Sequence, residues 1–496
     1  MVATVSEKTN ILSRISGTFS NLIFRDRDRE LPFAFILITL MASCGISPYE
    51  SFKRLMSVHI LPFIQKESRE IVRQVEVLGK DPLKAMLRRA EETESKIFSD
   101  FLKGYVSTVK SGGNVTSYLE SKLRSVIEVQ TAAAIRSIEK LETLVESYMV
   151  MLLILLCTYI LSAVMSSTAV VSSTLGVRLG GPSLVYFIVF VAMPLTSIFF
   201  MLFAHILQKG TFISVRKVYY RALPPAVGVA ALLALVILTP EARALVDSLG
   251  SSIFITVCLA AISLPPLISY RRMVGLNLQA EEEMPSFLRD VSETRKTGTS
   301  PEKSIVQSAR IKRSTAFSKV LRQVVNQIEW GVSLRKIYRD LKERINSWPV
   351  LMNFLILIET VEVGGGPSDA LEMLASYSEK MRDAEKNKRD MLRPYIILPF
   401  IWSVLMALTF TFTFFVITQI PTAYISEASF MTLERQMDIL SSAMIFHCWL
   451  SGFFIGKVTK GTFAAGFEYS VFLAVVSLAS LLLSQNFMST IVEVLM

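Results

Sequence analysis

Residues 148–172 read YMVMLLILLCTYILSAVMSSTAVVS and contain no charged side chain. A helix needs roughly 20 apolar residues to cross a bilayer, because each unpaired backbone group costs several kcal/mol in lipid. Six further stretches reach or approach that length, at 183–207, 222–239, 251–270, 394–418, 437–456 and about 465–486. We therefore expect seven membrane-spanning helices.

The composition of the whole chain agrees with this expectation. Of its 496 residues, 51% are hydrophobic and 19% are charged, and the mean hydropathy is +0.47. A soluble protein of this length would contain more charged residues. Patterns typical of strands are absent, so the expected fold is an all-α polytopic membrane protein.

The chain lacks the patterns of common enzyme chemistry. Its four cysteines form no C-x-x-C pair and its three histidines are scattered, which argues against a disulfide framework and a metal site. No serine elbow or dinucleotide fingerprint occurs, and the nearest string to a phosphate loop, GFFIGKV at 452–458, has the wrong spacing. We expect a protein that is not an enzyme and holds no cofactor.

Basic residues in the short loops predict the orientation of the helices. Loop 208–221 contains four lysines and arginines, loop 457–462 contains two lysines, and neither contains an acid. Both loops should face the cytoplasm, and helix parity then places residues 1–147 and 271–393 on the same side. This bias accounts for the net charge of +10. The sequence contains no basic stripe with interleaved aromatic residues, so nucleic-acid binding is not predicted.

The two cytoplasmic blocks repeat each other. At a shift of 253, LPFAFILITLMASCGISPYES (31–51) overlays MPSFLRDVSETRKTGTSPEKS (284–304), and later positions match at a shift of 252. A one-residue deletion explains the change of shift, and the chain alternates a soluble unit, four membrane helices, a soluble unit and three membrane helices. The paired markers are Gly45 with Gly298, Pro48 with Pro301, and Gly112-Gly113 with Gly364-Gly365.

These markers are typical of helix ends. Serine followed by proline begins a helix, and glycine in a left-handed conformation ends one. Each block therefore predicts a helical bundle of about 110 residues, large enough to fold around a core of its own. The expected divisions are an N-terminal segment 1–30, a cytoplasmic bundle 31–147, membrane helices 148–270, a second cytoplasmic bundle 271–393, membrane helices 394–486 and an extracytoplasmic tail 487–496.

The apolar run 31–43 resembles a signal sequence only superficially. The arginines before it alternate with acids, and about 13 residues are too few to span a bilayer. We expect this run to belong to the first bundle.

Two acids mark the end of the long helix of the second bundle. Glu359 and Glu362 lie in the last turns before Gly364, where a carboxylate opposes the helix dipole by about 0.3–1 kcal/mol. Solvent, a neighbouring lysine or an external partner can offset this unfavourable interaction. The sequence leaves these alternatives open.

Two further patterns concern the membrane. The cluster Lys386, Lys388 and Arg389 lies next to a spanning helix and suits lipid headgroups, solvent or an acidic partner. Gly452 and Gly456 form a G-x-x-x-G pair, which permits a close helix contact either within the chain or with a small membrane partner.

The chain has two duplicated bundles that are expected to lie in the cytoplasm. Each opens with proline, glycine and Ser-Pro and leads into membrane helices. In these features the chain resembles the type II secretion F-domain family. These are the platform proteins of type II secretion, type IV pili and archaella. Bacterial members typically have three membrane helices, so seven stretches look like the archaeal branch with its archaellum and adhesive-pilus platforms. The short Gly-Glu-x-x-Gly-like element of the family is matched in part by Glu362 to Gly365.

The resemblance implies a hexameric secretion ATPase, pilin-like or archaellin-like subunits, membrane lipids and a second copy of the chain as partners. We hypothesise that ATPase motion reaches the second bundle and passes along the helices at 118–147 and 372–393 to the spanning helices, which move subunits between bilayer and filament. The candidate docking residues are Glu359, Glu362, Lys386, Lys388 and Arg389.

The sequence leaves the kind of filament open. An archaellum, which also rotates, an adhesive pilus and a secretion pseudopilus all fit. A transporter or channel is the alternative from another class. Charged residues are missing from the middle of the apolar stretches, which argues against transport.

Overall fold

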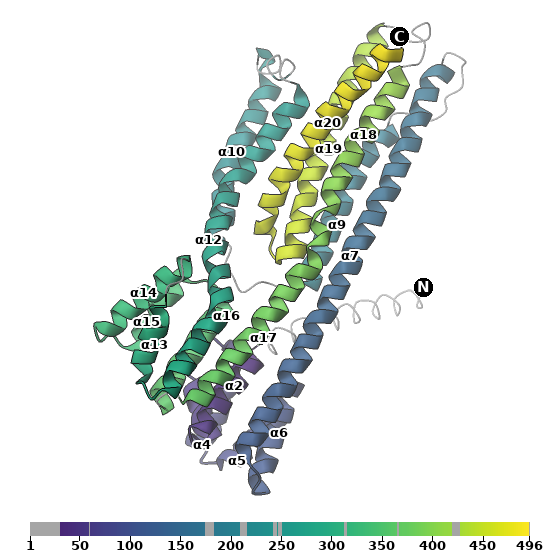
Figure 1. Ribbon diagram of the computed structural model, residues 1–496. Coiled ribbons are helices and arrows are strands. Elements are labelled where there is room, and N and C mark those ends of the chain that lie inside the picture. Colours follow the sequence, from purple (N-terminus) through teal and green to yellow (C-terminus); the bar gives the residue numbers. More distant parts are fainter. Residues whose placement is uncertain are drawn as a thin grey trace, which may run out of the picture. The chain divides into compact units, whose positions relative to one another are not determined.

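The structure, a computed structural model, describes residues 30–58, 60–173, 183–208, 216–241, 246, 250–311, 315–364, 367–418 and 427–495. In these residues all regular structure is helical (Figure 1). Seven of the helices are long and apolar enough to cross a membrane, and each overlaps one of the seven predicted stretches. The prediction of an all-α polytopic membrane protein is confirmed.

Contacts between residues divide the chain into two compact units. Unit 1 contains the described residues up to Ile135 together with Gly275–Glu385, and unit 2 contains Arg136–Val274 and the described residues from Lys386 onward. Three helices begin in one unit and end in the other, namely α7 (Val115–Ser173), α12 (Ser251–Lys296) and α17 (Ser368–Leu392).

Unit 1 contains both copies of the repeat. The first copy consists of α2 (Leu31–Ser43), α3 (Pro48–Leu55), α4 (Pro62–Glu76), α5 (Pro82–Glu92), α6 (Lys96–Lys110) and the start of α7. The second copy consists of the end of α12, α13 (Pro301–Ala309), α14 (Ala316–Glu329), α15 (Leu334–Arg344), α16 (Trp348–Gly364) and α17.

The two copies match helix for helix. At the shift of 253, α2 and α12 end at equivalent residues, and so do α4 and α14, at Glu76 and Glu329. At the shift of 252, α5 and α15 have the same bounds, and their N-caps are Asp81 and Ser333. The one-residue deletion predicted from the sequence therefore lies in the turn that follows α4 and α14.

The repeat markers lie at helix ends, as their residue types predict. Gly45 and Gly298 have φ of +80° and +83°, a conformation that side chains with a Cβ rarely adopt. After α6, the Gly112 N–H donates to the Val109 carbonyl over 3.2 Å and the Gly113 N–H donates to the Thr108 carbonyl over 2.9 Å. Together these two bonds form a Schellman motif that satisfies the last carbonyls of the helix.

The structure describes some, but not all, of the repeat markers of the second copy. Ser47 and Ser300 are the N-caps before Pro48 and Pro301, and the Ser47 hydroxyl accepts the Glu50 N–H over 3.3 Å. Helix α16 ends at Gly364. Gly365 lies outside the described residues, as do residues 1–29 of the N-terminal segment.

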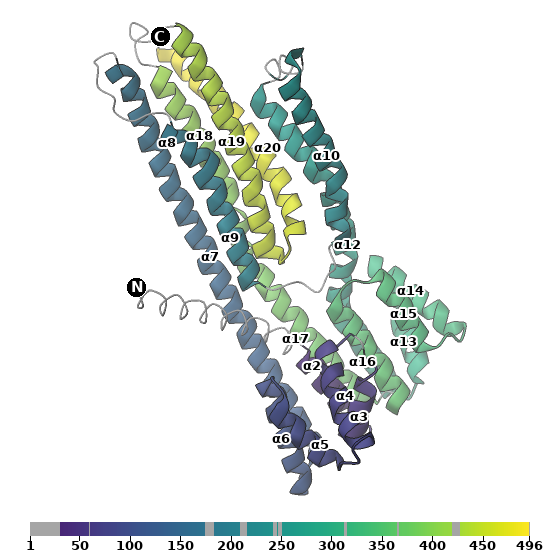
Figure 2. The same cartoon turned by 180° about the vertical axis from the view of Figure 1, so that it is seen from behind.

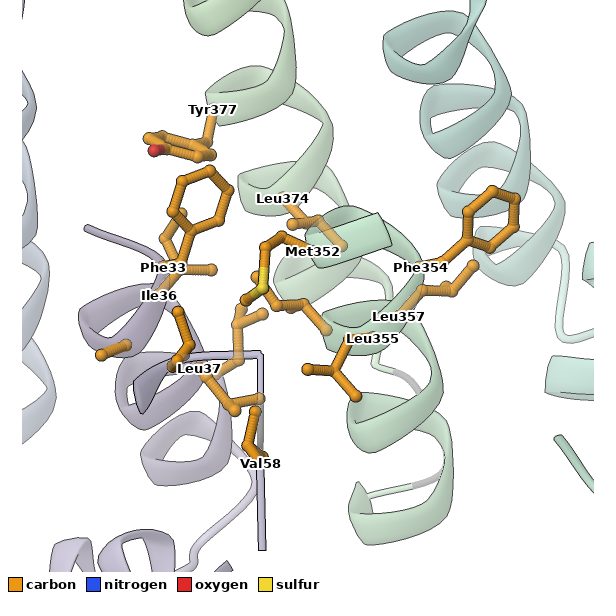
Figure 3. Packing of buried hydrophobic residues seen from close by; sticks show 14 of the residues in the cluster. Phe33, Ile36, Leu37, Val58, Met352, Phe354, Leu355, Leu357, Leu374 and Tyr377 are labelled. Atoms are coloured by element: carbon orange, nitrogen blue, oxygen red, sulfur yellow. The ribbon is translucent and has the colours of Figure 1, made fainter. Parts of the chain in front are cut away.

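A single hydrophobic core joins the two copies. The sequence predicts one core for each bundle, but the buried apolar side chains of both copies form one continuous cluster. Figure 3 shows the reason: Phe33, Ile36 and Leu37 of α2 face Met352 and Leu355 of α16. Helix α2 has apolar side chains on every side, and both copies cover them, so none of these faces is left in solvent.

Aromatic contacts show how α2 is held between the copies. The Phe35 ring stacks on Phe101 of the first copy with 4.0 Å between ring centroids. The Phe33 ring meets the edges of Trp348 and Tyr377 of the second copy at 4.6 and 5.2 Å. Edge-to-face pairs of this kind contribute about 0.5–1.5 kcal/mol beyond the area they bury.

A buried carboxylate connects the beginning of α2 to α4. Glu30 is 9% exposed, and its Oε2 accepts the Ile64 N–H over 3.1 Å, so that it caps a helix 34 residues away. Burial raises the pKa of Glu30 to about 7 from its ordinary 4.5, and the backbone bonds from Ile64 and Phe63 oppose this rise only in part.

A pH effect on stability follows from this raised pKa. The folded chain binds the Glu30 proton more tightly than the unfolded chain, so the stabilising contribution is complete below pH 4.5 and is lost as pH rises through about 7. The wild type should therefore lose at most about 3 kcal/mol of its free energy of unfolding between pH 5 and pH 8. Glu30→Gln should show no such loss. Thermal unfolding of the detergent-solubilised protein across this range measures it, and parallel profiles for the two proteins would contradict the assignment.

Unit 2 is built around α19. Besides parts of α7, α12 and α17, the helices of unit 2 are α8 (Ser183–Phe187), the π-helix η1 (Ile188–Ala192), α9 (Met193–Leu207), α10 (Arg216–Leu238), the 3₁₀-helix η2 (Pro394–Ile396), α18 (Leu398–Thr418), α19 (Glu427–Lys460) and α20 (Phe463–Leu495). Helices α9, α18 and α20 all contact α19 (Figures 1 and 2). Its apolar stretch is 72% buried within the protein, against 6% for α10, so α19 is the central helix of the unit.

Two details of unit 2 bear on the expected divisions. The break between α17 and α18 falls at η2, where Pro394 predicts a kink. Helix α20 continues to Leu495, so the expected tail 487–496 is helical through its described residues.

Candidate functional sites

The two acids at the end of α16 are held by an arginine of the same chain. Arg335 of α15 donates from Nε to Glu362 Oε2 over 2.8 Å, and its Nη2 lies 3.7 Å from Glu359 Oε1. Burial raises the pKa of Glu359, whose side chain is 7% exposed; Arg335 and Arg54 oppose the rise and Glu362 adds to it. The sequence alternatives name a neighbouring lysine, solvent or an external partner, whereas the structure pairs both acids with Arg335, an arginine of the preceding helix.

A pocket of about 270 Å³ opens beside these acids and is lined by both copies. Val58 and Ile60 of the first copy form its apolar side, and Arg335, Tyr338 and Glu359 of the second copy form its polar side. The pocket shows that the ends of α15 and α16 meet the linker between α3 and α4 of the first copy.

The basic cluster lies on α17, just beyond the point where the chain passes from unit 1 to unit 2. Lys386 is exposed, and Lys388 and Arg389 are half-buried. Of the three, Lys386 therefore offers the largest surface to lipid or to a partner.

The glycine pair lies where α19 meets α20. A Cβ on Gly452 would stand 2.4 Å from the backbone nitrogen of Ser470, and a Cβ on Gly456 would stand 2.2 Å from that of Gly466. A Cβ on Gly466 would in turn stand 2.6 Å from the Phe453 Cα. The two backbones approach each other so closely that no side chain fits between them.

A buried polar network in unit 2 escapes the sequence analysis. The Tyr148 hydroxyl of α7 lies 2.9 Å from Ser197 Oγ of α9 and 2.8 Å from Ser451 Oγ of α19. His447 Nε2 of α19 lies 3.1 Å from the same Ser197 Oγ, and His447 is fully buried. Four polar residues spread over three apolar stretches are a weak signal, and only the fold brings them together.

The network and its neighbours attach α19 to three other spanning helices. Besides the bonds to α7 and α9, the Trp449 Nε1 donates to Ser263 Oγ of α12 over 2.9 Å, and Ser441 Oγ lies 2.8 Å from Ser252 Oγ of α12. Buried polar residues in spanning helices are costly unless they are paired, and all four groups named here have partners.

A buried lysine joins the ends of two spanning helices. Lys457 is 2% exposed, and its Nζ donates to the Gln208 carbonyl over 3.0 Å and to the Gly461 carbonyl over 2.7 Å. These carbonyls lie at the C-terminal ends of α9 and α19, where the helix dipoles are negative. The bonds place the C-terminal ends of α9 and α19 on the same side of unit 2, which agrees with helix parity.

Removing this ammonium should loosen unit 2. Lys457→Met loses two charge-assisted hydrogen bonds, and we expect unfolding to become easier by about 3 kcal/mol. Lys386→Met, at an exposed position of the same unit, is the control and should leave the melting temperature unchanged. Thermal unfolding in detergent gives the comparison, and equal melting temperatures for all three proteins would refute the role of Lys457.

Among the described residues, no group of three or more histidine, cysteine, aspartate or glutamate side chains is placed to hold a metal ion.

Comparison with known proteins adds the family. The family model described as type II secretion system (T2SS), protein F, matches residues 34–163 and 287–414, and the two matches begin 253 residues apart, the shift of the repeat. A protein of Methanocaldococcus jannaschii named Uncharacterized protein MJ1286 is 23% identical over 474 residues, which cover 90% of this chain and 78% of that protein. No solved structure matches the chain.

The two matches together cover just over half of the chain, and they coincide with the two copies found in its sequence and in its helices. Each begins inside the first helix of a copy and ends inside a spanning helix, so it covers both the bundle and its exit into the membrane. The chain therefore belongs to the type II secretion system protein F family and contains two copies of its domain.

Proposed function

We propose that this multi-pass membrane protein couples a cytoplasmic secretion ATPase to the insertion of pilin-like subunits into an archaellum or a type IV pilus-like filament. The family makes the chain a platform protein of type II secretion or type IV pilus-like machinery, and members of the family are non-catalytic membrane components. Membership also implies, in general terms, association with a secretion ATPase and pilins.

The single core shared by the two copies carries the proposal. Because α2 packs against α16, a force applied to the second copy reaches the first through side chains of one core. Helices α7, α12 and α17 then run without interruption from unit 1 into unit 2. Helices α7 and α12 each contain a spanning segment, whereas α17 ends at Leu392, before the break at η2. Two continuous helices therefore give such a force a direct route to the membrane.

The proposal includes an orientation and a division of the chain. Residues 31–147 and 271–393 would lie in the cytoplasm, and 148–270 and 394–486 would lie in the membrane. Lys457 joins the C-terminal ends of α9 and α19, so these ends lie on the same side of unit 2. This supports the orientation, because the sequence that follows each end is basic.

Binding and filament assembly test the coupling. The full-length protein in nanodiscs should bind the cognate ATPase, and a deletion strain should regain filaments when the wild-type gene is returned. The triple charge reversal Lys386→Glu, Lys388→Glu and Arg389→Glu should abolish filaments while the protein still reaches the membrane. Intact filaments in that variant, together with no ATPase binding by the wild type, would remove the basis of the proposal.

The deletion strain also distinguishes the kinds of filament. Loss of swimming in soft agar would assign an archaellum, loss of surface attachment an adhesive pilus, and loss of protein export a pseudopilus. Solute flux through the purified protein in liposomes, with all three phenotypes unaffected, would favour a transporter instead.

A further inference from the structure

The two copies differ in charge at one equivalent pair of helices. The α14–α15 hairpin of the second copy (Ala316–Arg344) contains seven lysines and arginines and three acids, a net charge of +4. Its counterpart in the first copy, the α4–α5 hairpin (Pro62–Glu92), contains seven basic residues and six acids, a net charge of +1. All seven basic side chains of the α14–α15 hairpin are exposed.

The hairpins also differ in what lies between their helices. In the first copy, Arg89 of α5 donates from Nε and Nη2 to the buried Glu67 of α4 over 2.6 and 2.8 Å. The equivalent residues of the second copy are Leu341 and Val320, which form no such pair. Both of them line a pocket of about 230 Å³, which lies where the first copy has its ion pair.

An exposed tryptophan stands at the edge of this pocket. Trp330 is 84% exposed, and it follows the last residue of α14. The Gly331 N–H donates to the Ile328 carbonyl and the Val332 N–H to the Gln327 carbonyl, each over 2.9 Å, so the turn is a Schellman motif. The tryptophan is therefore presented from a fixed backbone and costs little entropy on binding.

A tryptophan on a fixed turn, a pocket with apolar lining and seven exposed basic side chains on the same hairpin form a surface suited to an acidic protein. We propose that the α14–α15 hairpin binds an acidic surface of the secretion ATPase, and that an apolar side chain of the ATPase enters the pocket against Trp330. This inference rests on the proposed function and names the surface that receives the ATPase. The α4–α5 hairpin has a buried ion pair at the equivalent place and a lower net charge.

A membrane surface fits these observations less well. Lipid binding favours a convex apolar face with few acids, whereas this pocket is concave and Asp340 lines it. Gln327 Nε2 donates to Asp340 Oδ2 over 2.6 Å, which fixes a polar wall beside the apolar floor. A shaped cavity with mixed walls selects a side chain of complementary shape.

The affinity of the full-length protein in nanodiscs for the cognate ATPase tests the proposal. Trp330→Ala should raise Kd roughly tenfold or more, because an exposed tryptophan beside a pocket is typical of a binding hot spot. The double variant Val320→Glu with Leu341→Arg rebuilds the ion pair of the first copy and fills the pocket, and it should weaken binding to a similar degree. Lys319→Glu with Arg322→Glu should weaken binding and reduce its dependence on salt.

The first copy supplies the matched controls. Leu78→Ala at the equivalent turn, and Lys66→Glu with Arg69→Glu on α4, should leave Kd unchanged. If the wild type binds the ATPase but Trp330→Ala and the pocket-filling variant bind equally well, the inference is wrong and the proposed function stands. If the wild type shows no binding at all, the proposed function fails and the inference fails with it. Weaker binding of Trp330→Ala to anionic lipid vesicles, with its ATPase affinity unchanged, would assign the hairpin to the membrane and overturn the proposal.

Discussion

Gly456→Val is expected to prevent α19 and α20 from packing, with the loss of most of the folded protein. Non-bonded carbon atoms lie about 3.5–4.0 Å apart, whereas a Cβ at this position would stand 2.4 Å from the Gly466 Cα. The obstructing atoms belong to the backbone, so no rotamer change removes the clash. The expected destabilisation is about 3 kcal/mol or more, measured as monodisperse yield and thermal unfolding in detergent.

Gly228→Val is the matched control for this substitution. Gly228 also lies in a spanning helix, α10, but a Cβ there meets no atom within 4 Å. The control should purify like the wild type. Equal yields and melting temperatures for Gly456→Val and Gly228→Val would show that the helices of the native protein are further apart than in this structure.

Phe33→Ala is expected to loosen both copies of the repeat at once. Phe33 is 2% exposed, and truncating a buried phenylalanine costs about 3–5 kcal/mol. Since its neighbours Trp348 and Tyr377 belong to the second copy, α16 and α17 should lose amide protection together with α4 and α6. Hydrogen exchange of the full-length protein, read by mass spectrometry, measures this.

The exposed Leu78 provides the comparison, because Leu78→Ala removes apolar atoms that are 57% exposed and should change protection little. Protection lost in the first copy alone would mean that the two copies fold around separate cores, as the sequence by itself predicts.

Much of the architecture can be predicted from local patterns. The spanning helices follow from apolar length alone, and the ends of the bundle helices follow from Ser-Pro and glycine at equivalent positions of the repeat. Each of these signals lies within a few residues of the feature that it determines. Nothing about the rest of the fold is needed to interpret it.

The shared core could not be predicted in this way. The run 31–43 is apolar on every side, which predicts burial but does not identify what covers it. The equivalent residues 284–296 are amphipathic, so the repeat itself suggests that each copy covers its own helix. Only the packing of α2 against α16 shows that the first copy buries its opening helix between the two copies.

The polar groups of the candidate sites also depend on long-range packing. Arg335 lies 27 residues before Glu362, and Tyr148 lies about 300 residues before Ser451, so no spacing rule connects them. The sequence analysis counts His447 among scattered histidines and Lys457 among the lysines of a loop, but it does not predict that both side chains are buried. His447 Nε2 and Lys457 Nζ each have a partner on α9, Ser197 and Gln208, and those partners are visible only in the fold.

The most direct test of the account is the side of the membrane on which the two copies lie. In a variant with the four native cysteines replaced by serine, Leu78→Cys marks the first copy and Trp330→Cys marks the second, both at exposed turns of unit 1. A membrane-impermeant maleimide should label both positions in inverted vesicles and neither in right-side-out vesicles. Labelling of the two positions from opposite sides would contradict the shared core, the cytoplasmic orientation and the coupling to a common ATPase.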